Sequence, residues 1–216
     1  MSDYRFLNII FDMDGTLWDA VDTYADIWNE TYRILGIDAR MTRDQLLDCM
    51  GLTLGTIIKR LNPEGIDEAQ FTATLREVDS RIMPAKGGTL YPGVREGLAR
   101  LSERFQLFMV SNCGPHGLDY FLRYTGLRPY IKDTLTNGQT HLSKADNIKL
   151  IMERHNLTDA VYVGDTQTDC DAAHLAGIPM IYMNYGFGEC SDADFRMHTF
   201  AELTDFLLTP NSPIGL

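Results

Sequence analysis

Two aspartates, Asp12 and Asp14, lie two residues apart where a short apolar run gives way to Gly15. A spacing of two places both carboxylates on one side of an extended chain. Carboxylates this close repel each other unless a cation neutralises them or one member keeps a proton. A divalent metal with oxygen ligands meets the first condition, and a nucleophile beside an acid/base meets the second. The pair alone also fits a solvated turn after a strand.

Residues suited to holding a phosphate group recur further along the chain. Ser111 and Asn112 end a second apolar run, and Gly114-Pro115 then open a helix whose first N–H groups are free to donate. Lys144 stands at the start of another helix, where a cation is unfavourable unless it meets an anion. Taken singly, these residues fit a turn, a helix cap or a surface lysine equally well.

A second pair of aspartates follows a third apolar run. Asp165 comes directly after Gly164, and Asp169 lies one helical turn later. That spacing lets both carboxylates approach the same point, which favours a metal site. Acidic capping of a helix is the alternative for this pair.

Apolar runs that alternate with helical segments must position these residues. The runs cover residues 6–11, 105–110 and 160–163, with weaker ones at 131–135 and 179–183. This alternation predicts an α/β fold with a parallel sheet and crossover helices. Ligands of such sheets bind at the carboxyl ends of the strands, so the polar residues at these ends are expected to converge.

Helical periodicity replaces this pattern between residue 19 and about residue 86. The first helix is expected to begin at Asp19 as its N-cap and to end at Gly36, with further helices at 43–50, 53–61 and 67–83. The sequence therefore predicts an α/β core domain of residues 1–18 and 87–216, and an inserted helical cap domain of residues 19–86. The cap is expected to close over the site, with the loop 50–53 reading the leaving group.

Composition limits the possible partners. A net charge of -11 opposes binding to nucleic acid or anionic lipid. We expect a small ligand, and a bound cation if that ligand is a phosphate. A cytoplasmic location is expected because no apolar span or signal peptide is evident. The four cysteines are widely spaced, so reduced structural thiols are expected rather than a zinc site. The oligomeric state is left open between monomer and dimer.

The order of these motifs resembles the four-motif set of the haloacid dehalogenase (HAD) superfamily. The matching segments are Phe11-Asp12-Met13-Asp14-Gly15-Thr16-Leu17, Val110-Ser111-Asn112, Lys144, and Val163-Gly164-Asp165-Thr166 with Asp169. Residues 172–178 and 185–188 resemble its phosphoglycolate phosphatase-like branch. The resemblance implies a Rossmann-like, doubly wound core with a helical type 1 cap.

By this resemblance, Asp12 would be the nucleophile that forms an aspartyl-phosphate, and Asp14 the acid/base. Lys144 would neutralise the charge of the intermediate. Magnesium would be held by the Asp12 carboxylate, the backbone carbonyl of Asp14 and the Asp165 carboxylate, with Asp169 supporting the site through a water or from behind these ligands. The implied activity is magnesium-dependent hydrolysis of a small phosphomonoester.

The resemblance also implies that Ser111, Asn112 and Thr16 bind the substrate. It leaves the ester itself open among phosphoglycolate, a sugar phosphate, a nucleotide and pyrophosphate. A sugar phosphomutase is an alternative because it shares both aspartates of the first motif, and a non-catalytic binding or regulatory module is another. Dehalogenation is disfavoured because it has no need of Asp14.

Overall fold

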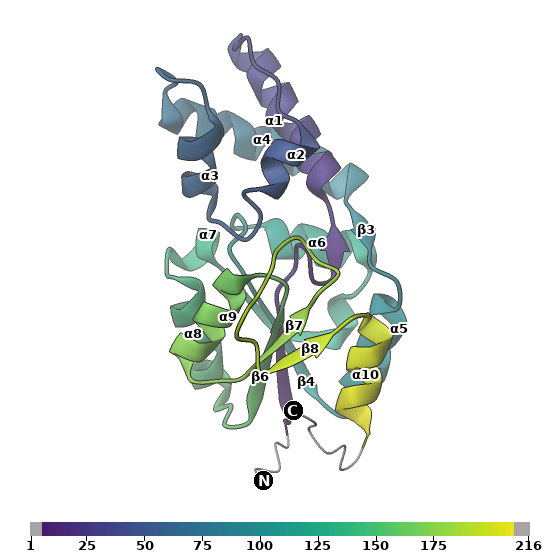
Figure 1. Cartoon of the computed structure of the whole chain (residues 1–216). Helices are drawn as coiled ribbons and strands as arrows, with labels where there is room; N and C mark the ends of the chain where they lie inside the picture. The colour runs from purple at the N-terminus through teal and green to yellow at the C-terminus, as the bar shows by residue number, and fades with distance from the viewer. Residues whose placement is uncertain (1–5, 210–216) are drawn as a thin grey trace.

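The computed structural model describes residues 6–209, and its α/β fold is built on one large parallel sheet (Figure 1). In chain order the six strands of this sheet are β1 (Asn8–Phe11), β4 (Gln106–Ser111), β5 (Ile131–Thr136), β6 (Ala160–Gly164), β7 (Met180–Met183) and β8 (Phe195–Met197). Their spatial order is β5-β4-β1-β6-β7-β8, and each pairs with its neighbours in parallel. Residues 1–5 and 210–216 of the predicted core domain lie outside the described residues.

Alternation of side chains along the central strands fills two separate cores. Ile9 and Phe11 of β1 belong to a core cluster with residues of α5 (Val94–Ser102), α6 (Gly117–Thr125) and α10 (Phe200–Leu208). Ile10 belongs to the opposite cluster, with α8 (Lys144–His155) and α9 (Gln167–Ala176). Both faces of the sheet are therefore buried, which is why its strands read as continuous apolar runs.

The direction of winding reverses at the middle of the sheet. From β1 the chain moves outward to β4 and β5, then returns to the other side of β1 with β6, β7 and β8. The carboxyl ends of β1 and β6 thus face a crevice at the switch point, where open α/β sheets bind ligands. The doubly wound α/β fold predicted from the sequence is confirmed, and β8 is a strand that the sequence reading did not identify.

Helices α1 (Val21–Leu35), α2 (Arg43–Leu47), α3 (Leu54–Leu61) and α4 (Glu68–Lys86) form a group beyond the carboxyl ends of the strands (Figure 1). All four lie close to the ranges expected from periodicity. The predicted division into a core and a cap at these residues stays a prediction. Two shorter elements, η1 (Arg128–Tyr130) and α7 (Asn137–Thr140), lie between α6 and α8.

The prediction that Asp19 caps the first helix is wrong. Ala20 occupies the N-cap position, and Asp19 lies in β2 (Trp18–Asp19), which pairs antiparallel with β3 (Thr89–Leu90). The Asp19 carboxylate instead accepts a hydrogen bond from Val21 N at 3.0 Å and pairs with Arg43 of α2. The two chain crossings between sheet and helices are therefore tied to each other by a small strand pair.

Within residues 6–209, no helix combines the length and the hydropathy needed to cross a bilayer.

Candidate active site

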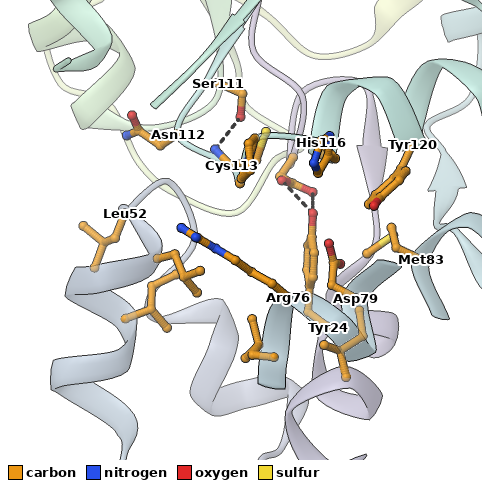
Figure 2. A pocket seen from close by; sticks show the side chains of 18 of the residues that line it. Tyr24, Leu52, Arg76, Asp79, Met83, Ser111, Asn112, Cys113, His116 and Tyr120 are labelled. Atoms are coloured by element: carbon orange, nitrogen blue, oxygen red, sulfur yellow. Dashed lines mark hydrogen bonds between the residues drawn. The ribbon is translucent and has the colours of Figure 1, made fainter. Parts of the chain in front are cut away.

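A cavity of about 500 Å³ lies between the carboxyl ends of the strands and helices α1–α4. The sheet side contributes five of the residues predicted for the site: Asp12, Asp14, Ser111, Asn112 and Lys144. The helical side contributes mostly apolar residues together with Arg76 and Asp79 of α4, which Figure 2 shows near Tyr24. The cavity is thus polar where the strands end and largely apolar on the opposite wall.

Three buried carboxylates meet at the strand ends that form the floor of this cavity, and of the three only Asp12 lines the cavity itself. Carboxylate oxygens of Asp12, Asp165 and Asp169 all lie within 4.8 Å of one another, as the predicted convergence of strand ends requires. Lys144 Nζ lies 2.5 Å from Asp169 Oδ1 and 3.3 Å from Asp12 Oδ1. The buried ammonium accounts for the placement of a lysine at a helix start, because it meets two anions there.

The balance of charge at this floor is negative, and the pKa values reflect it. Burial raises the pKa of Asp12 to about 6, with Lys144 opposing the shift and Asp169 adding to it. The pKa of Asp165 rises well above its ordinary value, through burial and then through Asp169 and Asp12. Burial disfavours the charge of Lys144, but Asp12 and Asp169 raise its pKa above the usual range. One cation is therefore insufficient for three carboxylates.

Asp165 is held in one position from several sides. Its Oδ1 accepts a hydrogen bond from Thr16 Oγ1 at 2.9 Å, and its Oδ2 accepts one from Phe187 N at 2.8 Å. Gly15 has a φ of +83°, and a Cβ there would lie 2.0 Å from Asp165 Oδ2; a Cβ on Gly186 would lie 2.2 Å from Asp165 Cβ. Both glycines are required because the backbone passes so close to this carboxylate.

Thr16 and Asp169 act on other protein groups rather than facing the cavity. Thr16 is fully buried, is not among the cavity-lining residues and donates its hydroxyl to Asp165, so the geometry favours a positioning role over the predicted substrate contact. Asp169 Oδ2 accepts bonds from Asp165 N and from Thr166 N and Oγ1. With Oδ1 bound to Lys144, Asp169 is engaged on both oxygens, as a residue supporting the site would be.

The Asp14 carboxylate accepts its hydrogen bonds from two aromatic side chains, and not from the residues of this cluster. Trp18 Nε1 donates to its Oδ1 at 2.9 Å, and the Tyr24 hydroxyl lies 3.1 Å from its Oδ2. Burial and then the charge of Asp12 raise its pKa to about 7, while Trp18 and Tyr24 lower it. A carboxyl poised near neutral pH is suited to proton transfer. Neither Trp18 nor Tyr24 was assigned this contact from the sequence, since helical spacing of aromatics indicates only core packing.

Ser111 and Asn112 lie at the end of β4 but make different contacts. Ser111 Oγ is 3.4 Å from the backbone nitrogen of Cys113, whose N–H donates to it (Figure 2). Asn112 Nδ2 donates to Gly51 O at 2.8 Å, so its side chain ties the sheet to the loop between α2 and α3. Burial raises the pKa of the Cys113 thiol well above its usual value, which argues against a reactive thiolate.

Three charged residues of α4 also line the cavity, Arg76, Glu77 and Asp79, and the sequence reading missed all of them. Arg76 extends toward the segment that carries Asn112 and Cys113 (Figure 2), and it makes no hydrogen bond or ion pair within residues 6–209. Asp79 lies one turn further along, and burial raises its pKa to about 6. In the sequence, charged residues at helical spacing indicate only a solvent-exposed helix face. The tertiary arrangement is what turns this face of α4 toward the strand ends.

The donor set fits a hard divalent cation such as Mg²⁺. All three carboxylates of the floor are buried, and carboxylate oxygens are the ligands that Mg²⁺ prefers. Asp12 Oδ1 is buried and receives no hydrogen bond among the described residues, although Lys144 Nζ is its ion-pair partner. An unsatisfied buried anion of this kind is stabilised by a bound cation. The predicted contribution of the Asp14 backbone carbonyl stays a prediction.

Comparisons with known proteins agree with this geometry. The family model described as haloacid dehalogenase-like hydrolase matches residues 9–183. A phosphoglycolate phosphatase of Vibrio vulnificus is 31% identical over 228 residues, covering 96% of this chain and 99% of the relative. A phosphoglycolate phosphatase of Synechococcus elongatus is 29% identical, with 94% and 93% covered.

Solved structures share the fold. A predicted phosphatase from Clostridium acetobutylicum superposes with a TM-score of 0.79 at 23% identity, over 94% of this chain and 98% of that one. CbbY from Rhodobacter sphaeroides, solved in complex with phosphate, has a TM-score of 0.79 at 22% identity, over 92% of this chain and 96% of that one. Both likenesses extend across sheet and helical insertion alike.

Proposed function

Because the chain belongs to the haloacid dehalogenase-like hydrolases and is a phosphatase of their phosphoglycolate phosphatase-like branch, we propose that it hydrolyses a phosphate monoester with Mg²⁺ through an aspartyl-phosphate on Asp12. The observation that carries this proposal is the juxtaposition of Asp12 with Lys144 and the buried carboxylates at the switch point of the sheet. A binding module would have no need of this costly arrangement of charges.

Each residue has a role that its surroundings support. Asp12 attacks phosphorus, and the bond to the leaving oxygen breaks as Asp14 gives that oxygen its proton. Asp14 then takes a proton from the water that hydrolyses the aspartyl-phosphate, which regenerates both carboxyl groups. Ser111 and the N–H groups after it bind the phosphoryl oxygens, and Lys144 offsets their negative charge.

Mg²⁺, held by Asp12 and Asp165, would supply further charge stabilisation to the transferring phosphoryl group. Thr16, Gly15 and Phe187 keep Asp165 aimed at the floor of the cavity, so the metal ligand needs no reorganisation when the substrate binds. Asp169 in turn holds Lys144 beside Asp12, where its ammonium can act on the phosphoryl group.

Hydrolysis of p-nitrophenyl phosphate and of a panel of phosphate monoesters tests the proposal. We expect turnover with Mg²⁺, complete loss of activity in excess EDTA, and recovery when Mg²⁺ is returned, because three buried carboxylates with one lysine cannot hold a further phosphate dianion alone. Activity that persists in chelator would remove the metal from the mechanism. Absence of turnover on every ester would refute the proposed reaction itself.

The ester we propose is a small phosphorylated metabolite with a second anionic group, of which phosphoglycolate is the first to test. The curated relatives named above are phosphoglycolate phosphatases. Arg76 is a guanidinium without a protein partner among the described residues, and it enters the cavity from α4 in the helical insertion, toward Asn112 and Cys113 (Figure 2). A carboxylate or a second phosphate on the leaving group would bind it with charge-assisted hydrogen bonds.

Arg76→Met is therefore expected to raise KM for phosphoglycolate about 10-fold to 100-fold, since a hydrogen bond to a charged group contributes about 1.5–3 kcal/mol. KM for p-nitrophenyl phosphate, which has no second anion, should change little. Arg81→Met, on the same helix but outside this cavity, is the matched control. Equal effects of Arg76→Met on both esters would show that Arg76 does not read the leaving group.

Tyr24→Phe tests the proton-transfer role of Asp14 through pH. The Tyr24 hydroxyl stabilises the charged form of Asp14 and so lowers its pKa from the value that burial would impose. Without it the pKa rises, and the general acid stays protonated to higher pH. The alkaline limb of kcat should move upward by up to about one unit, given about 0.5–1.5 kcal/mol for a hydrogen bond.

The control for this shift is Tyr120→Phe, because Tyr120 also lines the cavity, whereas the side-chain hydrogen bonds to Asp14 among the described residues come from Trp18 and Tyr24. If the alkaline limb of kcat stays in place in Tyr24→Phe, or moves equally in both variants, the group that titrates in this limb is not Asp14.

A further inference from the structure

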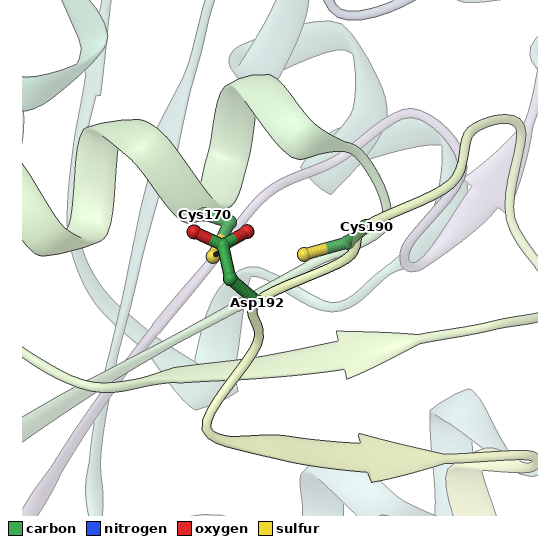
Figure 3. A group of neighbouring side chains, drawn as sticks. All are labelled: Cys170, Cys190 and Asp192. Carbon is green, nitrogen blue, oxygen red and sulfur yellow. Dashed lines mark hydrogen bonds between the residues drawn. The ribbon is translucent and has the colours of Figure 1, made fainter.

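A second group of metal-ligating side chains lies behind the active site, between α9 and the loop that follows β7. Cys170 comes from α9, and Cys190 and Asp192 come from the loop (Figure 3). Both thiols are buried and free, whereas Asp192 is exposed. The wide spacing of the cysteines in sequence gives no indication of a metal site, and the fold brings these two sulfurs close together.

The distances in this group match the edges of a small coordination polyhedron. One sulfur from each cysteine and one Asp192 oxygen all lie within 4.8 Å of one another, and Cys170 Sγ is 3.7 Å from Asp192 Oδ1. Zinc bonds of about 2.3 Å to sulfur and 2.1 Å to oxygen, at a tetrahedral angle, place such ligands about 3.6 Å apart. The three side chains therefore need little movement to share one ion.

The surroundings of the group also suit a cation. His174 lies one helical turn after Cys170, with Nδ1 3.7 Å from Cys170 Sγ and Nε2 2.9 Å from Asp194 Oδ2. An imidazole oriented by a carboxylate is a common neighbour of metal sites and a ready acceptor for a thiol proton. Gln167 Nε2 donates to Asp192 Oδ1 at 2.7 Å and keeps that carboxylate over the sulfurs.

Two buried thiols alone would be ordinary core residues. Burial raises the pKa of the Cys170 thiol, with Cys190 and Asp192 adding to the shift, so this thiol stays protonated until a metal displaces its proton. A pair of core thiols has no need of a carboxylate beside it, and the Asp192 carboxylate that Gln167 holds over the sulfurs therefore points to a metal site. The two groups of ligands also differ in the metal that they prefer. Thiolates select zinc-like ions, whereas the carboxylates of the active-site floor suit Mg²⁺.

We propose that Cys170, Cys190 and Asp192 form a binding site for a thiophilic divalent cation of the zinc class, with three protein ligands and an outward position left to water. Binding converts two thiols to thiolates and releases their two protons to solvent, with His174 as the adjacent base. The ion would fasten α9, whose Asp169 accepts a hydrogen bond from Asp165 N, to the loop whose Phe187 N–H donates to the Asp165 carboxylate.

The test is titration of the reduced full-length protein with Cd²⁺, and separately with Co²⁺, in excess Mg²⁺ to occupy carboxylate sites. Thiolate-to-metal charge-transfer absorption reports sulfur ligation without reference to enzyme activity. We expect saturation at one equivalent, loss of the band in Cys170→Ser and in Cys190→Ser, and at least about a tenfold weaker affinity in Asp192→Asn.

Matched controls are available for both ligand types. Cys49→Ser removes a buried thiol of the helical insertion, and Asp171→Asn removes an exposed carboxylate that also accepts from Gln167 Nε2. Both should retain the band and its affinity. Asp192→Asn alters only an exposed side chain, so it keeps the test decisive if a buried Cys170→Ser fails to fold. The proposal would be overturned if the wild type shows no band, or if the band persists in Cys170→Ser or in Cys190→Ser. An unchanged affinity in Asp192→Asn would overturn it as well.

Discussion

Asp12→Asn is expected to lower kcat by at least about 10⁴-fold, the scale seen when a catalytic nucleophile is removed. The substitution keeps the shape of the side chain but removes the attacking oxygen anion, and it takes one negative charge from a floor that Lys144 only partly neutralises. The fold should therefore be retained or stabilised while the activity is lost. Thermal unfolding and hydrolysis of p-nitrophenyl phosphate measure the two effects separately.

A chemical trap identifies the residue that carries the phosphoryl group. Acid quench of the wild type during turnover, followed by borohydride reduction, should convert the phosphorylated aspartate to homoserine, and peptide mass spectrometry should find it at residue 12. The exposed Asp119 provides a matched Asp→Asn control that should retain both activity and the trapped product. A modified residue elsewhere in the chain would contradict the nucleophile assignment.

The active-site floor was predictable because its residues end apolar runs. Asp12 and Asp165 each follow a buried strand and Ser111 is the last residue of one, and parallel strands expose their carboxyl ends at one edge of the sheet. Lys144 was predictable from electrostatics, since a lysine at a helix start needs an anion nearby. Local sequence patterns are sufficient to predict which residues lie close together where this depends only on their position at the ends of parallel strands.

Contacts that depend on packing between distant elements left no such signal. Tyr24 reaches Asp14 only because α1 lies over the strand ends, and Arg76 enters the cavity only because of how α4 is rotated. The resemblance predicts Thr16 as a substrate ligand and gives no sign that its hydroxyl donates to Asp165. Cys170 and Cys190 meet because the chain returns along the edge of α9 after β7.

Contacts between the helical insertion and the sheet flank the cavity on both sides. Asn112 Nδ2 binds Gly51 O at one side, and the Tyr24 hydroxyl binds Asp14 at the other. The predicted role of loop 50–53 gains support from the first contact, because Met50, Gly51 and Leu52 line the cavity. The predicted opening of the insertion would break both hydrogen bonds, one of which is made to the proposed acid/base.

Asp14→Asn should separate the two halves of the reaction. Asparagine cannot give or take the catalytic proton, and steady-state kcat is expected to fall about 10²-fold to 10⁴-fold, the usual contribution of general acid–base catalysis. Formation of the aspartyl-phosphate from p-nitrophenyl phosphate should suffer less, because nitrophenolate leaves without protonation. Its hydrolysis should become slow, because no carboxylate remains to take the proton of the attacking water.

Stopped-flow release of p-nitrophenolate measures both halves in one experiment. The variant should show a burst of about one equivalent per active site, followed by a slow steady state, and the borohydride trap should find residue 12 largely phosphorylated. With esters of alkyl alcohols, whose oxygen does need a proton, the borohydride trap should find less phosphorylated residue 12. The amide oxygen that replaces the carboxylate can still accept from Trp18 Nε1, so the loop geometry around Asp12 is kept. Equal slowing of the burst and the steady state with p-nitrophenyl phosphate would instead assign Asp14 to positioning, because a misplaced nucleophile slows the first step whatever the leaving group.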